Sequence, residues 1–328
     1  MKVRRLHFFL FIVGLICLLW MLHTVGVGGV WNGIKSLRWG LIPFVLLEGI
    51  GEVMHAEGWR CCLSGHACSI SRGRLFWSRL AGYSINYFTP TAAMGGEVVR
   101  ASLITESGGA ADAASSVLID KVCYATAHLT WVLIGVFLIG GYVKIPAAWR
   151  DTMLVSCSLV SFGILSFGLI QKNGKIGSIL RWLVSRNIGG QQVYRLSNSL
   201  SSVDDSFRIF YRDRKRDLSY AFGWHLVGIS MGFFQTWLFF SLRHQRISPL
   251  LMLNIWVIGL WFDLVSFLIP MNIGSLEASR MFTFIAYGFR AVEGLTYGML
   301  LRLAQIAWAV TGLVGYAFLT LFQVDRSK

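Results

Sequence analysis

A short charged motif occurs twice in this chain, each time within an otherwise apolar stretch. In both copies a glutamate follows a proline by seven residues, and an arginine follows the glutamate by three. The residues are Pro90, Glu97 and Arg100 in the first copy and Pro270, Glu277 and Arg280 in the second. A further basic residue follows each arginine after 21 or 22 positions, namely Lys121 and Arg302. The repeat predicts two pseudo-symmetric halves, each interrupted at a corresponding place.

The apolar stretches around the motif predict an integral membrane protein. The chain of 328 residues is 55% hydrophobic and 14% charged, with a mean hydropathy of +0.60. Segments of about 20 apolar residues, the length that spans a bilayer as a helix, recur along it. We therefore expect an all-α integral membrane fold with seven to eight transmembrane helices plus two re-entrant or broken elements.

The predicted spans alternate with polar connections. They are Leu6–Val27, Trp39–Trp59, Val122–Tyr142, Leu154–Ile170, Leu218–Leu242, Leu250–Ile269 and Leu295–Phe322. The domain prediction is a first transmembrane half at 1–171, a basic cytoplasmic helical linker at 172–217, and a second transmembrane half at 218–328. Within the linker, Ile179 to Arg186 suggests an amphipathic helix on the inner leaflet, and Thr105–Ala114 reads as a small, polar loop. An eighth crossing near 277–289 would place the carboxyl end in the cytoplasm.

The formal charge of +14 has two explanations, nucleic-acid binding or the excess of basic residues in cytoplasmic loops. We favour the second, because the basic residues lie mostly between the apolar segments. No nucleic-acid partner is expected, the amino terminus is predicted to be cytoplasmic, and the anionic lipid surface is the default partner.

Glycine and proline mark the interrupted elements, near 75–104 and near 270–290. Proline disfavours helix at the preceding residue, so the chain should turn at Pro90 and Pro270. Gly95, Gly96 and Gly274 permit close approach of the backbone, and amides at the starts of the following helices could meet an anion. Non-helical backbone at membrane depth requires a protein interior or a cavity, so the motif predicts a cavity.

Several further polar residues lie within apolar segments and are candidates for lining that cavity. Glu48 and Glu52 are four residues apart on one helix face, although Glu52 could also lie among headgroups. Asp263 is a deep carboxylate that should pair with Arg280 or Arg302. Asn86 and Asp120 complete the candidates for a lipid-headgroup cavity, together with Glu97, Arg100, Lys121, Glu277, Arg280 and Arg302.

The charged pairs have a purely structural alternative. Glu97 with Arg100, and Glu277 with Arg280, are three residues apart and could neutralise each other on one helix face. Buried ion pairs rarely add net stability, so we favour a ligand role. Arginines would then bind a phosphate, and carboxylates an amine.

Catalysis and cofactors find little support. The sequence contains no nucleophile elbow, no His-Glu-x-x-His motif and no phosphate-binding glycine loop, so no catalytic residues and no cofactor are predicted. Cys61, Cys62, Cys68 and His66 have no recognised zinc spacing, so no metal site is predicted either.

The ordered set of motif residues resembles a known family. Asn86, Pro90, Gly95-Gly96-Glu97, Arg100, Ser116–Lys121, Pro270, Gly274, Glu277 and Arg302 are similar to the flippase-like transmembrane family that includes the transmembrane region of lysylphosphatidylglycerol synthases and hopanoid-associated membrane proteins. The resemblance implies movement of a phospholipid or related amphiphile between leaflets of the bacterial inner membrane. It covers nearly the whole chain.

The chain departs from the family pattern at three points. The acidic-basic pair before the third span is Asp120-Lys121 where the family usually has Glu-Arg, which keeps the charges but not the forked geometry of arginine. The second motif lacks the usual glycine-rich run after its proline. The aminoacyl-transferase domain is absent from the sequence, so lipid synthesis is not implied.

The sequence therefore predicts a membrane lipid translocator that is not an enzyme. The alternative is an integral-membrane enzyme or accessory subunit acting on a lipid-linked substrate, in which Glu48/Glu52 or Asp120 with Glu97 would supply acid-base groups or Mg²⁺ ligands. A homo-oligomer or a lipid-synthesis enzyme partner is compatible with either prediction.

Overall fold

The structure is a computed structural model that describes residues 26–64, 69–89, 95–142, 147–178, 201–266 and 272–326, with a few isolated positions besides. Most of the first predicted span, the predicted amphipathic segment after Ser178, Pro90 and Pro270 lie outside the described residues. Every regular element of the described part is a helix and none is a strand, which confirms the predicted all-α class.

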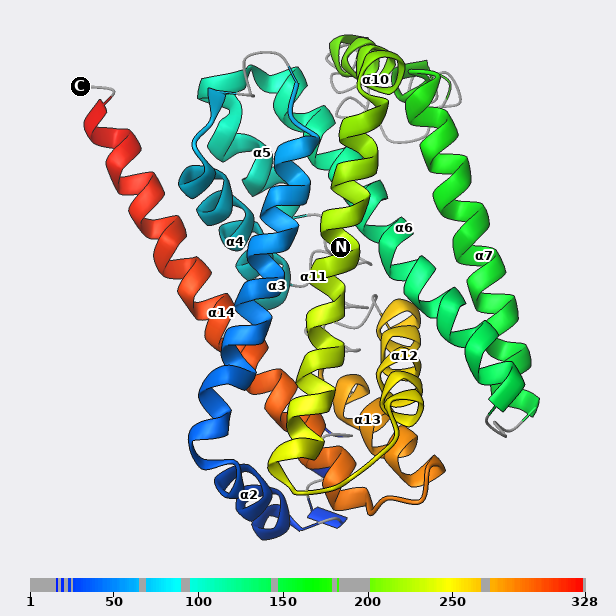
Figure 1. Ribbon diagram of the computed structural model, residues 1–328. Helices are drawn as coiled ribbons and strands as arrows, with labels where there is room; N and C mark the ends of the chain where they lie inside the picture. The colour runs from blue at the N-terminus through cyan, green and yellow to red at the C-terminus, as the bar shows by residue number, and fades with distance from the viewer. Residues whose placement is uncertain are drawn as a thin grey trace.

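The elements follow one another along the chain with short connections. They are α2 (Val27–Ser36), a 3-10 helix η1 (Arg38–Gly40), α3 (Leu41–Cys61), α4 (Arg72–Phe88), α5 (Gly95–Gly108), α6 (Ala110–Tyr142), α7 (Ala147–Lys172), α10 (Ser201–Asp213), α11 (Lys215–Leu242), α12 (Pro249–Val265), α13 (Ser275–Ala286) and α14 (Ala291–Arg326). Figure 1 shows α11 running through the middle of the bundle, with α3 and α6 beside it.

Four of these helices are long and apolar enough to cross a membrane. The apolar segments that could cross it lie within α6, α7, α11 and α14. Large apolar side chains such as Phe137 on α6 and Phe162 on α7 are 80% and 73% exposed. Such exposure is unfavourable in water and ordinary in hydrocarbon, which agrees with a bilayer-spanning protein. The helix α3 is of similar length but carries several charged residues, and α12 is shorter.

Local sequence signals define several helix starts. Ser71 precedes α4, and its hydroxyl accepts a hydrogen bond from the Arg74 amide at 3.3 Å. Ser248 caps α12 in the same way, accepting from the Leu251 amide at 3.2 Å, with Pro249 in the first turn. These caps satisfy amides that have no partner inside the helix.

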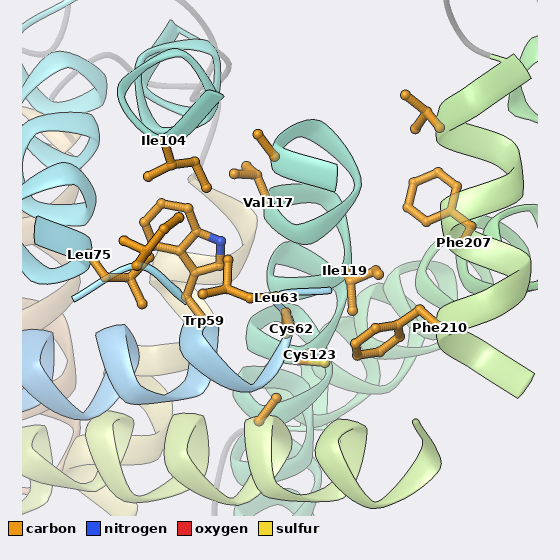
Figure 2. Close-up of a cluster of buried hydrophobic side chains, with 14 residues drawn as sticks. Trp59, Cys62, Leu63, Leu75, Ile104, Val117, Ile119, Cys123, Phe207 and Phe210 are labelled. Carbon is orange, nitrogen blue, oxygen red and sulfur yellow. The ribbon is translucent and has the colours of Figure 1, made fainter. Parts of the chain in front are cut away.

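The two interrupted elements lie toward opposite ends of the molecule. Figure 1 shows α5 in the half that contains α10, and α13 in the half that contains α2. Each end has its own apolar core. Figure 2 shows the first, a cluster that runs from Trp59 and Ile104 at one side to Phe207 and Phe210 at the other. In the second, Phe239, Phe284 and Tyr297 pack together across α11, α13 and α14.

The first interrupted element is a close-packed pair of helices. A Cβ atom placed on Gly96 would lie 2.0 Å from the Gly82 carbonyl oxygen, so α4 and α5 touch backbone to backbone. Glycine is required at this contact because every other residue would push the two helices apart. The amide of Gly96 donates a hydrogen bond to Asn86 Oδ1 at 2.7 Å, which fixes the start of α5 on α4.

One local prediction is wrong. Thr105–Ala114 was expected to be a loop, but α5 continues to Gly108 and α6 begins at Ala110. Only Gly109 breaks the helices, with a φ of 78° that favours glycine. The small residues of this stretch pack against neighbouring helices, and Ala113 is fully buried, so tertiary contact overrides its polar composition.

Candidate functional site

A cavity lined by both charged and apolar residues lies between the two ends of the bundle. Its volume is about 750 Å³, and side chains from α3, α4, α6, α7, α11, α12, α13 and α14 line it. Cavities of this size accommodate small ligands or headgroups. Its lining combines charged side chains with aromatic rings, among them Tyr83, Tyr124 and Trp256.

The predicted site residues fall into two groups around this cavity. The residues that line it are Glu48, Glu52, Asn86, Lys121, Asp263 and Arg280. Five others, Glu97, Arg100, Asp120, Glu277 and Arg302, are in ion pairs and are not among the lining residues. Gly95 and Gly274 lie at the helix starts, whereas Pro90 and Pro270 lie outside the described residues.

Six charged residues of α3, α4, α5 and α6 form one alternating network. The contacts run from Glu52 to Arg79 at 3.2 Å, Arg79 to Asp120 at 3.3 Å, Asp120 to Arg100 at 2.6 Å, Arg100 to Glu97 at 3.0 Å, and Glu97 to Lys121 at 2.6 Å. Each carboxylate in it has a basic partner, as burial requires. The guanidinium of Arg100 also lies over the Trp59 ring, 4.2 Å from its centroid.

The second half has two separate pairs. Arg280 on α13 donates to both oxygens of Asp263 on α12, at 2.7 and 3.2 Å, and to the Gly259 carbonyl at 2.9 Å. Glu277 pairs with Arg302 on α14, whose guanidinium also donates to the Asn272 carbonyl at 2.9 Å. Asp263 therefore pairs with Arg280, one of its two predicted partners.

The local pairing within the motif occurs in only one copy. Arg100 contacts Glu97 three residues before it, but Arg280 and Glu277 each pair with a residue on another helix. The two copies differ because neighbouring helices supply other partners in the second one. Asp263 on α12 accepts from Arg280, and two nitrogens of Arg302 on α14 donate to Glu277.

At the helix starts, where an anion site was expected, two backbone amides donate to side chains of the protein. The Gly96 amide donates to Asn86, and the Gly274 amide donates to Glu277 Oε2 at 3.0 Å. Glu277 thus caps its own helix as well as binding Arg302. These two amides are satisfied without a ligand.

Glu48 differs from the other carboxylates of the cavity. Its carboxylate accepts a hydrogen bond from Gln235 Nε2 at 3.2 Å, and no basic side chain pairs with it among the residues that the structure describes. Glu52 and Asp263 line the same cavity but are paired with Arg79 and Arg280. Glu48 therefore offers the cavity a carboxyl group that no neighbouring cation engages.

Sequence reasoning missed three residues of this region. Arg79 joins Glu52 to Asp120, and a buried pair of histidines, His55 and His225, contacts Asp120. The signal for Arg79 was present, because an arginine within an apolar helix needs a partner. The histidine pair gave no such signal, since its members are 170 residues apart.

Metal ligation has no arranged site in the described part of the chain. No three His, Cys, Asp or Glu side chains there are grouped so that they could hold a metal ion. Cys68 and His66, from the cysteine-rich loop considered above, lie outside the described residues.

This fold and cavity define a class: a polytopic α-helical membrane protein with charged side chains gathered around an internal pocket. Residues 8–315 match the family described as the lysylphosphatidylglycerol synthase TM region, and the chain belongs to that family. The resemblance inferred from the sequence is thereby confirmed, and the chain is a membrane protein of a family related to lipid handling. Neither a curated protein nor a solved structure matches the chain.

Proposed function

We propose that the protein moves a phospholipid or related amphiphile between the leaflets of the bacterial inner membrane, with its headgroup passing through the central cavity. The observation that supports this most directly is that both halves contribute charged residues to one pocket. Lys121 comes from the first half and Arg280 from the second, and the pocket lies between the two interrupted elements. Inverted repeats that meet at a midplane site are the usual architecture of secondary transporters.

The chemistry of the lining fits a zwitterionic or anionic headgroup. Lys121 and Arg280 line the pocket and would donate to a phosphate in competition with their partners Glu97 and Asp263. Glu48 supplies an acceptor for an amine without first breaking an ion pair. The acyl chains would remain in the bilayer, against the exposed apolar residues of the long helices.

The enzyme alternative has less support. Of the carboxylates that could serve as acid-base groups or magnesium ligands, Glu52, Asp120 and Glu97 are each engaged by arginine or lysine. Use of any of them as an acid-base group or magnesium ligand would break an ion pair of the network described above.

A leaflet-exchange assay tests the proposal. Purified protein is reconstituted into vesicles that contain trace phosphatidylethanolamine or phosphatidylglycerol with a fluorescent acyl chain, and exchange is followed by quenching of the outer leaflet. Glu48→Gln should slow exchange of the amine-containing lipid roughly ten- to a hundredfold, since a hydrogen bond to a charged group contributes about 1.5–3 kcal/mol.

Glu57→Gln is the matched control, because Glu57 lies on the same helix but does not line the cavity and pairs with Arg60 at 2.7 Å. Its exchange should remain at the wild-type rate. Vesicles with wild-type protein that exchange neither lipid faster than protein-free vesicles would contradict the proposed function. Equal rates in wild type and Glu48→Gln would contradict the role of the cavity.

A further inference from the structure

Two histidines from distant parts of the chain meet beside the cavity. The Nδ1 atoms of His55 on α3 and His225 on α11 are 3.0 Å apart. On its other side, His225 Nε2 lies 2.9 Å from Asp120 Oδ1. His55 lines the cavity, whereas His225 is fully buried. The three side chains form a hydrogen-bonded path from the buried ion-pair network to the cavity.

Two glycines leave room for this contact between α3 and α11. A Cβ atom on Gly228 would lie 2.6 Å from His55 Cε1, and one on Gly58 would lie 2.9 Å from His225 Cε1. Each histidine thus occupies the space opposite a glycine of the other helix. The helices α3 and α11 are therefore shaped around the imidazole pair.

The hydrogen-bond partners determine where the protons lie. Asp120 contacts the guanidiniums of Arg79 and Arg100, so its carboxylate accepts and His225 Nε2 donates. In a neutral His225, Nδ1 then has a lone pair, which accepts from His55 Nδ1–H. His55 Nε2 is then the one basic nitrogen of this hydrogen-bonded path, and His55 is the histidine that lines the cavity.

This hydrogen-bonded path can take up one proton in two transfers. A proton from the cavity binds His55 Nε2, and the proton on His55 Nδ1 passes to His225 Nδ1. The positive charge then resides on His225, next to the Asp120 carboxylate, and His55 is neutral again with its proton on Nε2. Reversal of the two transfers releases the proton.

The charged and titratable groups around the pair come from six helices. Glu48 and Glu52 lie on α3, Arg79 and Tyr83 on α4, Arg100 on α5, Asp120, Tyr124 and His128 on α6, and Asp263 on α12, with His225 itself on α11. The ring of Tyr124 packs edge-on against both imidazoles, with centroids 5.1 and 5.6 Å away. The network from Glu52 to Lys121 alternates carboxylates with basic groups, so its charges balance and an added proton leaves it positive.

We propose that the His55–His225 pair is a proton-binding site that couples proton movement to lipid movement in the opposite direction. The inference rests on the translocation proposed above. Glu48, Glu52 and His55 lie four and three residues apart on α3, and all three line the cavity. A proton on the pair adds positive charge beside the pocket that is to receive a headgroup amine at Glu48, so proton and amine each weaken the binding of the other.

The test uses the full-length protein in vesicles with a gradient of about one pH unit. Trace phosphatidylethanolamine carries the fluorescent label on an acyl chain, so that its amine remains free, and equal potassium with valinomycin holds the membrane potential at zero. One proton exchanged per lipid stores about 1.36 kcal/mol per pH unit, which drives a roughly tenfold excess of labelled lipid toward the acidic side. Lumenal pyranine should record the accompanying change in pH.

Two asparagine variants locate the site. His55→Asn keeps an N–H near the Nδ1 position for His225 but lacks the basic nitrogen, so the leaflet ratio should fall to about one, the value without coupling. His244→Asn is the matched control, because His244 is exposed in the turn after α11 and its φ of 54° suits asparagine. This variant should keep the wild-type ratio.

The outcomes separate the two proposals. Wild-type exchange with a leaflet ratio near one and no pyranine signal overturns the coupling and leaves translocation intact. No exchange in the wild type overturns both. A wild-type ratio in His55→Asn overturns the assignment to the histidine pair, and the pyranine measurement on the wild type decides coupling even where that variant does not fold.

Discussion

The ammonium group of Lys121 on α6 lies 2.6 Å from the carboxylate of Glu97 on α5. The second half contains the corresponding pair, Glu277 on α13 with Arg302 on α14. The spacing of the repeat therefore reproduces a three-dimensional contact, a motif glutamate bound to a basic residue on the next helix. The two contacts differ in burial: the Lys121 side chain is 42% exposed and the Arg302 side chain 7%.

This difference predicts unequal costs of removing the basic partner. Arg302→Gln leaves Glu277 fully buried without its cation and should destabilise the protein by about 3–5 kcal/mol. Lys121→Gln leaves Glu97 with Arg100, and should cost about 1 kcal/mol or less. Thermal unfolding in detergent measures both. A lower melting temperature for Lys121→Gln than for Arg302→Gln would contradict the assigned burial.

The close packing of α4 on α5 predicts that alanine is not tolerated at Gly96. Its methyl group would collide with the Gly82 carbonyl oxygen at 2.0 Å, and backbone cannot move aside as a flexible side chain can. Gly96→Ala should therefore lower the melting temperature. Gly73→Ala on α4 is the control, since nothing lies within 4 Å of its Cβ position. That change should be neutral or raise stability by about 0.5–1 kcal/mol, the helix preference for alanine over glycine. Equal melting temperatures in the two variants would refute the close contact.

The cavity can be filled from one glycine without a clash. Gly163 on α7 lines it, and nothing lies within 4 Å of a Cβ atom built there. Gly163→Phe should place a ring in the headgroup space and slow leaflet exchange severalfold, while leaving the melting temperature unchanged or higher. Gly223→Phe on α11 has equally open surroundings but does not line the cavity. Exchange that is slowed equally in both variants would indicate a general effect of added bulk rather than obstruction of the pocket.

The sequence predicted the fold class and many of the charged residues around the cavity, but only some of their partners. Apolar length shows which segments cross a bilayer, and a charge within such a segment must have a partner nearby. Which partner it has depends on how the helices pack. Asp120 and Asp263 bind the corresponding arginines Arg100 and Arg280, yet Asp120 lies on the helix after its arginine and Asp263 on the helix before. Spacing alone cannot distinguish these arrangements.

The histidine pair illustrates the same limit more strongly. His55 and His225 are unremarkable individually, because an isolated histidine in an apolar helix is usually satisfied by the backbone, as His128 is by the Leu260 carbonyl at 2.9 Å. Their contact arises only because α3 and α11 approach through Gly58 and Gly228. Long-range contacts of this kind require the fold.

The orientation of the chain is open to direct test. Its basic segments predict that α10 faces the cytoplasm, and Figure 1 places the carboxyl end of α14 at the same end of the molecule as α10. The turn between α13 and α14 lies toward the opposite end, beside α2.

Two exposed positions mark these ends, Asp205 on α10, with a side chain 68% exposed, and Arg290 in the turn, with one 75% exposed. With the six native cysteines replaced, Arg290→Cys should react with a membrane-impermeant maleimide on intact spheroplasts. Asp205→Cys should react only after the membrane is opened, because a charged reagent does not cross hydrocarbon. Reaction of Asp205→Cys on intact spheroplasts would reverse the predicted topology, and reaction of both positions would contradict their placement on opposite sides.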